Sequence, residues 1–377
     1  MPAKRSPDEP VEGPAPGTER GAPAAGRAAP RREIDAKAGA APARIGVVGA
    51  GTMGAGIAQL CCLGGRATML YDADDAALER GAERVRGGLE RGAERGLWTG
   101  AEAASAARRL QTAGGDGLAD LAGCEVIIEA VPEDLGLKRR VFADLAAACG
   151  PDVILATNTS SLPVTEIAAG VPHPGRVVGL HFFNPPTRMQ LVEVVAGAET
   201  AGSTLAAAEA LVRAIGREPV LTADQPGFIV NRCARPFTLE ALRLAGEGVA
   251  DFATIDRVCR AGGGFAMGPF ELIDLVGVDV NLEVARSFYR QAGEPERWRP
   301  SPIQEEMVAA GRLGRKTGHG FYEYGDAPAG DRAPRHRAPD PDYALQPPTL
   351  DPADLARIAP RAPEILTRIV AQIVNEA

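Results

Sequence analysis

The stretch Gly49-Ala50-Gly51-Thr52-Met53-Gly54 decides the fold, and it directly follows an apolar run at residues 45–48. A G-x-G-x-x-G sequence between a strand and a helix is typical of the first turn of a dinucleotide-binding α/β fold. In such a turn Gly49 permits a tight bend, Gly51 lets the backbone approach a pyrophosphate, and Gly54 allows the helix to pack closely on the strand. We therefore expect the whole turn, Thr52 and Met53 included, to bind a dinucleotide at the start of the following helix.

An acidic residue follows at the end of the next apolar run, where Asp72 comes 18 positions after Gly54. A carboxylate at this place accepts hydrogen bonds from the adenosine ribose. It also repels the additional phosphate of NADP, and no arginine stands where that phosphate would need one. The sequence therefore predicts NAD as the cofactor. The alternative, a turn whose glycines are only structural, is disfavoured by the strand, the helix and the acid around the motif.

Short apolar runs alternate with helical stretches through the first half of the chain. After residues 45–48 they recur at 67–71, 126–131, 153–156, 177–180 and 191–195. Strands that alternate with helices indicate a mostly parallel sheet, so we predict an α/β fold with a Rossmann-type, doubly wound sheet over residues 44–224. From about Pro226 the strand runs stop and long helical segments appear. An all-helical C-terminal domain is expected at residues 225–324.

Three further segments lie outside these two domains. Residues 1–43 are rich in Ala, Pro, Gly and charge without any period, and we expect a disordered tail. Residues 325–362 are again rich in Pro, Asp and Ala, which indicates a linker. Residues 363–377 carry apolar pairs at helical spacing, so a helix is expected there.

Composition narrows the class of protein. Asp and Glu number 49 against 41 Lys and Arg, and a net charge of -8 argues against a nucleic-acid binder. The six cysteines form no C-x-x-C pair and lie in apolar runs, which is typical of a reducing, cytoplasmic compartment. No run approaches the roughly 18 apolar residues of a membrane span, and no histidines have metal-ligand spacing. We expect a cytoplasmic protein without membrane, nucleic-acid or metal partners.

A second group of polar residues stands at the ends of later apolar runs. His181 ends one such run, and strand ends line the ligand crevice of an open α/β sheet. Histidine can remove a hydroxyl proton while hydride leaves the carbon, because its ordinary pKa is near neutral. Glu193 is flanked by valines, where a carboxylate needs a partner, and Asn158 and Ser160 can hold a substrate oxygen. The alternative, a hydrogen-bonded core histidine, is disfavoured by this combination downstream of a dinucleotide motif.

These segments together resemble the 3-hydroxyacyl-CoA dehydrogenase family, including its bacterial 3-hydroxybutyryl- and 3-hydroxyadipyl-CoA dehydrogenases. The resemblance runs from about Arg44 to Tyr324. The matching motifs are at 49–56, 129–133, 158–161, 181–185, 191–195, 226–232, 267–271 and 314–322. It implies NAD-dependent oxidation of an L-3-hydroxyacyl-CoA to the 3-oxoacyl-CoA, in fatty-acid or aromatic-acid catabolism.

The resemblance also implies a role for each matching residue. His181 corresponds to the catalytic base and Glu193 to its charged partner, while Ser160 and Asn231 correspond to residues that hold the substrate. Arg95 falls near a lysine that binds the phosphate of CoA in relatives. Cofactor contacts beyond the glycine turn and Asp72 are implied for Glu133, Lys138, Ser160, Asn184 and Lys316.

The end of the chain resembles the start of the helical domain. Shifted by 136 positions, Ile365 aligns with Ile229 and Arg368 with Arg232. Because some relatives carry two helical modules, 363–377 is expected to begin a truncated second module, and to form an isolated or loosely docked helix. The first module would then expose an apolar face and form a homodimer. A chance amphipathic tail is the alternative.

Two other functions stay open at this point. One is a catalytically silent, crystallin-like protein that only binds NAD, although His181, Glu193, Ser160 and Asn231 are all present. The other is a dehydrogenase of a hydroxy acid that carries no CoA. Competition by CoA thioesters would distinguish the latter from a hydroxyacyl-CoA dehydrogenase.

Overall fold

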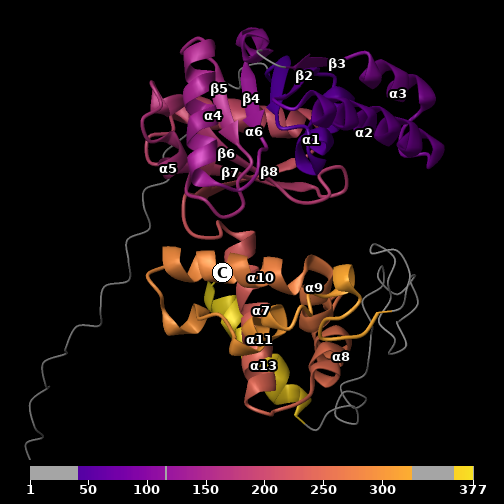
Figure 1. The fold of residues 1–377 in the computed structure, drawn as a ribbon, viewed down its shortest axis with the longest axis vertical. Helices are drawn as coiled ribbons and strands as arrows, with labels where there is room; N and C mark the ends of the chain where they lie inside the picture. The colour runs from indigo at the N-terminus through magenta and orange to yellow at the C-terminus, as the bar shows by residue number, and fades with distance from the viewer. Residues whose placement is uncertain (1–40, 115–116, 325–360, 377) are drawn as a thin grey trace, which may run out of the picture. The chain divides into compact units, whose positions relative to one another are not determined.

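The computed structural model describes residues 41–114, 117–324 and 361–376 (Figure 1). Most of the predicted tail, 1–40, and most of the predicted linker, 325–360, lie outside the described residues. Within the described ranges, no helix combines the length and the apolar character that crossing a bilayer requires.

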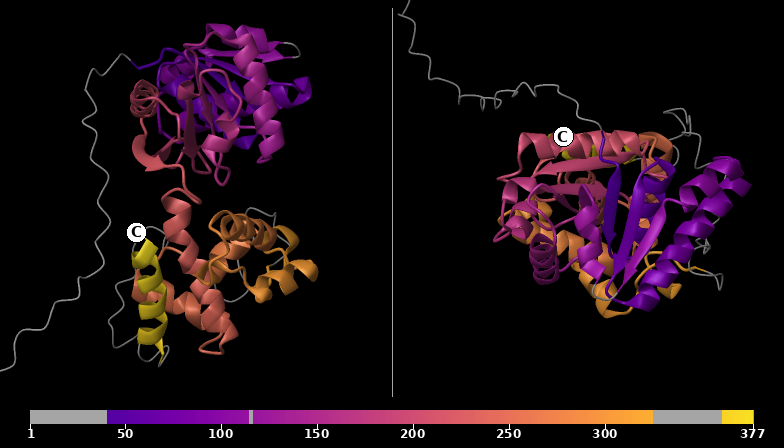
Figure 2. Two further views of the ribbon diagram at one scale, coloured as in Figure 1. Left: turned by 90° about the vertical axis from the view of Figure 1, so that its left-hand side faces the viewer. Right: turned by 90° about the horizontal axis from the view of Figure 1, so that it is seen from above.

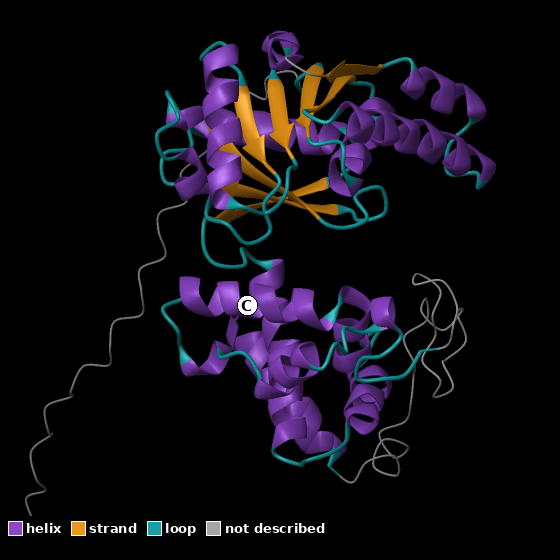
Figure 3. Cartoon of the chain, in the orientation of Figure 1, coloured by secondary structure: helices purple, strands orange, loops and turns teal. Residues whose placement is uncertain are grey.

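One eight-stranded sheet forms the N-terminal part, in the order β3-β2-β1-β4-β5-β6-β7-β8 (Figure 3). All neighbouring strands are parallel except β6 and β7, which are antiparallel. The strands are β1 (Arg44–Val48), β2 (Ala67–Asp72), β3 (Leu110–Gly114), β4 (Val126–Glu129), β5 (Ile154–Thr157), β6 (Val177–Phe182), β7 (Leu191–Ala196) and β8 (Glu218–Ala223). The chain reverses its direction of travel across the sheet between β1 and β4, and the loops after these strands therefore border a crevice.

The sheet is covered on both faces, as a doubly wound fold requires. Buried residues of four helices pack on one face and those of two helices on the other. The first group is α1 (Thr52–Leu63), α2 (Asp75–Glu94), α3 (Gly100–Ala107) and α6 (Gly202–Ala214), and the second is α4 (Leu135–Ala148) and α5 (Val164–Ala168). The predicted fold class is confirmed.

The sequence prediction missed two strands, β3 and β8, and both are edge strands. In β3 only two of five residues are buried, and in β8 only two of six. An edge strand that is exposed along much of its length carries no continuous apolar run, which is the pattern that identified the other strands.

The C-terminal part is helical and has a separate core. Its helices are α7 (Val230–Gly246), α8 (Phe252–Gly263), α9 (Pro269–Val276), α10 (Val278–Gln291), α11 (Pro302–Ala309) and α13 (Ala362–Glu376). Two buried carboxylates hold its loops together. Asp256 accepts hydrogen bonds from the N–H groups of Phe270 and Glu271 and from the hydroxyl of Tyr322. Asp274 accepts in the same way from the N–H groups of Phe321 and Tyr322.

The expectation that the last helix is isolated or loosely docked is wrong. Helix α13 packs against α7 and α8, and the left view of Figure 2 shows it beside α7. Ile365 and Ile369 are fully buried in the helical core. Arg368 forms an ion pair of 2.6 Å with Glu240, whose side chain is 4% exposed. The tail therefore covers an apolar face and neutralises a buried charge on the helix whose sequence it resembles, and neither partner surface was visible in the sequence.

Candidate active site

The glycine turn lies between β1 and α1. The surroundings of each glycine show why a residue without a side chain stands there. Gly49 has φ of +97°, and a Cβ there would lie 2.8 Å from the carbonyl oxygen of Ala130. A Cβ on Gly54 would lie 1.7 Å from the oxygen of Gly49, so only glycine lets α1 approach this closely. A Cβ on Gly51 would meet nothing within 4 Å. That open side, at the start of α1, leaves space for a phosphate group of the dinucleotide.

Asp72 ends β2 next to this turn. Its Oδ2 accepts the N–H of Ala50 at 2.7 Å, and its Oδ1 accepts the N–H of Asp74 at 3.0 Å. Both oxygens are therefore fixed at the end of the strand. The turn and this carboxylate together fit a dinucleotide.

His181 and Glu193 form the centre of a second cluster. They are opposite each other in the antiparallel pair of β6 and β7, and His181 Nδ1 lies 2.7 Å from Glu193 Oε2. Both residues are buried. The other oxygen of Glu193 accepts the N–H groups of Ile229 and Val230, at 2.9 and 2.8 Å. Glu193 is thus fully hydrogen-bonded, and Nε2 is the histidine nitrogen that stays available for a substrate.

A cavity of about 560 Å³ extends from His181 to Met53 of the dinucleotide turn. Its wall includes six of the predicted site residues, namely Met53, Glu133, Ser160, His181, Asn184 and Asn231. The side-chain amide of Asn231 donates to the carbonyl of Ser160 at 3.3 Å, which ties the first turn of α7 to the loop after β5. Asn158, the other hydrogen bonder expected there, also lines the cavity and accepts the N–H of Phe182.

An ion network around the buried Lys138 supports the loop that carries Ser160. Glu133 accepts the Thr159 hydroxyl and the Ser160 and Ser161 N–H groups at 2.7, 2.9 and 3.0 Å. Burial acts to raise the pKa of Glu133, but the ammonium of Lys138 and these hydrogen bonds lower it overall. Lys138 is fully buried, 2.7 Å from Glu129 and 3.5 Å from Glu133. The resemblance implied a cofactor contact for Lys138, whereas its side chain lies behind the cavity wall and holds Glu133.

Two other residues with a predicted contact, Arg95 and Lys316, do not line the cavity. Arg95 is exposed at the end of α2. Lys316 is bonded to Asp279 at 2.6 Å, and neither residue lines the cavity. His319 is exposed, as is His173, and in the described ranges no group of His, Cys, Asp and Glu could hold a metal ion.

Sequence reasoning missed one charged residue of the cavity, Arg235. The signal was available, because Arg235 follows Asn231 by four positions and α7 brings such residues to one face. The sequence predicts long helical segments from about Pro226, but it does not show which of their polar positions face a cavity.

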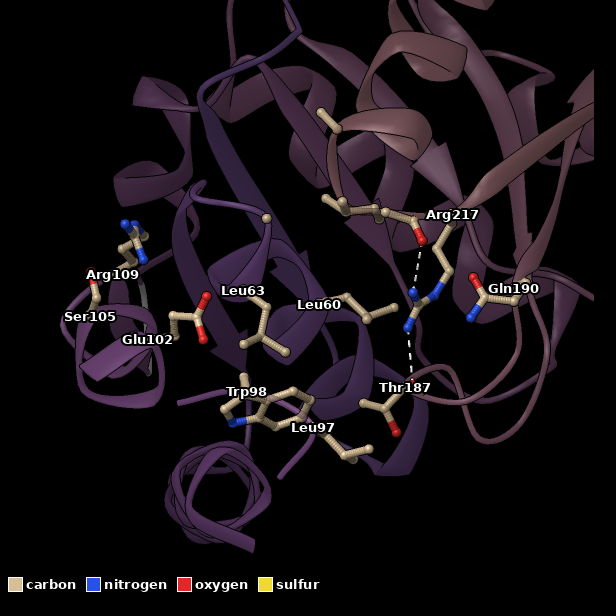
Figure 4. Close-up of a pocket in the computed structure, with 14 residues that line it drawn as sticks. Leu60, Leu63, Leu97, Trp98, Glu102, Ser105, Arg109, Thr187, Gln190 and Arg217 are labelled. Carbon is tan, nitrogen blue, oxygen red and sulfur yellow. Dashed lines mark hydrogen bonds between the residues drawn. The ribbon is translucent and has the colours of Figure 1, made fainter. Parts of the chain in front are cut away.

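A second cavity of about 560 Å³ lies beside the end of α1 (Figure 4). Leu60, Leu63, Leu97 and Trp98 form its apolar wall. Arg109 and Arg217 also line it, and Arg217 donates to the carbonyls of Gly216 and Thr187 and so supports the loop before β7. None of the predicted site residues lines this second cavity.

Two family models match the chain. That of the 3-hydroxyacyl-CoA dehydrogenase NAD-binding domain covers residues 44–225, and that of the 3-hydroxyacyl-CoA dehydrogenase C-terminal domain covers residues 227–324. The Escherichia coli protein named 3-hydroxyadipyl-CoA dehydrogenase is 42% identical over 280 residues, which are 74% of this chain and 58% of the relative. This chain therefore spans less than two thirds of that relative. A Bacillus subtilis protein named probable 3-hydroxybutyryl-CoA dehydrogenase is 40% identical over 281 residues, 74% of this chain and 97% of the relative.

Solved structures give the same result. The crystal structure of 3-hydroxybutyryl-CoA dehydrogenase from Escherichia coli is similar with a TM-score of 0.73 and 42% identity, over 75% of this chain and 59% of the other. The crystal structure of (S)-3-hydroxybutyryl-CoA dehydrogenase from Ralstonia eutropha is similar with a TM-score of 0.73 and 38% identity. That likeness covers 76% of this chain and 100% of the other.

Proposed function

The chain belongs to the 3-hydroxyacyl-CoA dehydrogenase family, and from this premise we propose that it is an NAD-dependent L-3-hydroxyacyl-CoA dehydrogenase. The reaction moves a hydride from the 3-carbon of a hydroxyacyl-CoA thioester to NAD and yields the 3-oxoacyl-CoA. The observation that supports it best is the buried pair of His181 and Glu193, 2.7 Å apart, whose histidine lines a cavity that also reaches Met53 of the dinucleotide turn. Fatty-acid or aromatic-acid catabolism is the metabolic setting that the family implies.

We propose the following roles in this reaction. NAD, when bound, accepts the hydride. Nε2 of His181 takes the proton of the 3-hydroxyl, and Glu193 holds Nδ1 and opposes the positive charge that forms on the ring. Ser160 and Asn231 hold the substrate, and Asn184 lies at the nicotinamide end of the cavity. Glu133 positions the loop of Ser160, and Lys138 positions Glu133.

Arg95 and Lys316 have the least support for their implied contacts, with CoA and with the cofactor respectively. Arg95 has no place in the cavity wall, and the ammonium of Lys316 is held by Asp279. Their substitution therefore belongs after the tests of His181 and Glu193.

The activity is tested by following NADH formation from NAD with a panel of L-3-hydroxyacyl-CoA esters of increasing chain length. Turnover of at least one ester supports the proposal. Free 3-hydroxy acids and the R isomers of the esters are the controls. Binding of NAD without turnover of any ester would favour a silent NAD-binding protein, and turnover of a free acid alone would favour a dehydrogenase of non-CoA substrates.

Asp72 is expected to set the choice between NAD and NADP. The Asp72→Ser variant loses a carboxylate that binds the ribose and repels the phosphate of NADP, so the ratio of kcat/KM for NAD to that for NADP should fall at least tenfold. A charged hydrogen bond is worth about 1.5–3 kcal/mol, which corresponds to that range. Steady-state kinetics with both cofactors measure the ratio. The matched control is Asp75→Ser, which removes an exposed acid three residues away, and equal ratios in both variants would contradict the role of Asp72.

We propose that the protein is cytoplasmic and forms a homodimer. The buried cysteines, all free in the structure, fit a reducing compartment. Val370 and Val374 are 41% and 65% exposed on the outer side of α13, one turn apart, and such a stripe favours association with a second copy. Light scattering is expected to give twice the monomer mass, and Val374→Glu should lower the association constant. A monomer at every concentration would contradict the dimer.

A further inference from the structure

Arg235 is a buried cation without a partner. Its residue surface is 8% exposed, and in the described part of the chain its guanidinium forms no hydrogen bond or ion pair. Arg176, which is buried to a similar extent, donates instead to the carbonyls of Gly150 and Val153. A buried charge that is neither paired nor hydrogen-bonded is costly to the folded state. Such a residue in a cavity wall is therefore a candidate for binding an anion.

The cation lies in the same cavity as the catalytic pair. Asn231, Arg235 and Thr238 recur at helical spacing and present one face of α7 to the cavity. The start of α7 is fixed to the pair, since Glu193 accepts the N–H groups of Ile229 and Val230. Arg235 then follows Asn231 by four residues, about 6 Å along the helix axis at 1.5 Å per residue.

The rest of the cavity carries little charge that could compete for an anion. The acidic residue among those that line it is Glu133, which accepts hydrogen bonds from the loop of Ser160 and shares the ammonium of Lys138 with Glu129. Burial lowers the pKa of Arg235 to about 10, which still leaves the guanidinium charged at neutral pH. An anionic group near α7 would therefore meet one uncompensated positive charge among the residues that line this cavity.

Part of the wall of this cavity is apolar. Leu272, Val276 and Val284 from α9 and α10 line the same cavity as Arg235. Methylene groups of an acyl chain gain free energy by packing on such a wall. A chain whose 3-carbon sits at His181 needs only three further carbon–carbon bonds, of about 1.5 Å each, to bring a sixth carbon toward Arg235.

We propose that Arg235 binds a carboxylate at the far end of the acyl chain, so that the preferred substrates are CoA thioesters of 3-hydroxy dicarboxylic acids. This inference rests on the proposed dehydrogenase activity. The guanidinium offers paired donors that match a carboxylate in geometry as well as charge. The residue thus determines specificity and takes no part in the proton or hydride transfer.

The test compares two esters of equal chain length, 3-hydroxyadipyl-CoA and 3-hydroxyhexanoyl-CoA, which differ only in the terminal carboxylate. The unmodified protein is expected to show the higher kcat/KM with the adipyl ester. Arg235→Met should lower kcat/KM for that ester by roughly 10- to 150-fold, the range for a hydrogen bond to a charged group, and leave the hexanoyl ester unchanged or improved. Arg235→Lys should retain part of the preference. The control is Arg286→Met, which removes an arginine of α10 that pairs with Glu305. This variant should keep the preference for the adipyl ester.

The outcomes separate this inference from the proposed function. If neither ester nor any other hydroxyacyl-CoA is oxidised, the dehydrogenase activity is wrong. If both esters are oxidised equally well by the unmodified protein, or if Arg235→Met lowers both by the same factor, the activity stands and the carboxylate site is wrong. An equal loss would mean that Arg235 contacts the thioester or CoA. The comparison in the unmodified protein needs no variant to fold, and Arg235→Met should in any case raise the melting temperature, because it removes an unpaired buried charge.

Discussion

The His181→Gln variant is expected to lower kcat by about 10²- to 10⁴-fold, which is the usual contribution of a general base. Glutamine can still form a hydrogen bond toward Glu193, but its amide cannot take up the hydroxyl proton. The dissociation constant of NADH should stay nearly unchanged, since the dinucleotide turn and Asp72 lie on other strands than His181. Kinetics with saturating hydroxyacyl-CoA and a fluorescence titration of NADH measure the two quantities.

His319 supplies the matched control for this variant. It is exposed in the turn that precedes the buried Phe321, so His319→Gln should leave kcat unchanged. Turnover by His181→Gln within a factor of a few of the unmodified protein would show that another group accepts the proton. A parallel loss of NADH binding would show that His181 acts through the cofactor site instead.

The Glu193→Gln variant is expected to lose up to about 10⁴-fold in kcat, the size of the effect when the carboxylate of a Ser-His-Asp triad becomes an amide. The amide oxygen of the glutamine can still accept the hydrogen bonds from the N–H groups of Ile229 and Val230. Its NH₂ group then faces Nδ1 of His181. The ring would then carry its proton on Nε2. That nitrogen could no longer accept the proton of the substrate hydroxyl.

Stability separates this tautomer effect from simple misfolding. Because the two backbone hydrogen bonds survive in Glu193→Gln, the melting temperature should stay close to that of the unmodified protein. Glu199→Gln changes an exposed carboxylate near the same strand and should alter neither kcat nor stability. A folded Glu193→Gln protein with normal turnover would contradict the role proposed for the carboxylate.

The central part of the fold could be predicted from the sequence because its signals are local. Six strands appeared as apolar runs, and the glycine turn requires its residues for reasons confined to a few neighbours, such as the carbonyl oxygen of Gly49 that a Cβ on Gly54 would overlap. The edge strands β3 and β8 gave no such signal. The docking of α13 was also beyond prediction, since Arg368 and its partner Glu240 are 128 positions apart and nothing local links them.

The candidate site divides in the same way. Residue types and strand ends were enough to select His181 and Glu193, and the antiparallel register of β6 and β7 then places them opposite each other. The contacts of Lys138 and Arg235 could not be predicted from the sequence. Whether a lysine faces a cofactor or lies fully buried behind Glu133, and whether an arginine on a helix has a partner, depend on which side chains the tertiary fold brings together.

The bond between Glu193 and the start of α7 also has a mechanical consequence. The carboxylate that holds His181 is the point at which the first turn of α7 is attached, through the N–H groups of Ile229 and Val230. If this helix tilts, it would rotate about that attachment at its N-terminal end. Asn231, next to the pivot, would be displaced least, and groups farther along the helix would be displaced in proportion to their distance. Such a motion would therefore leave the geometry at His181 nearly unchanged. The part of the cavity wall formed by later residues of α7 would move, and the width of the cavity there could adjust to the acyl chain.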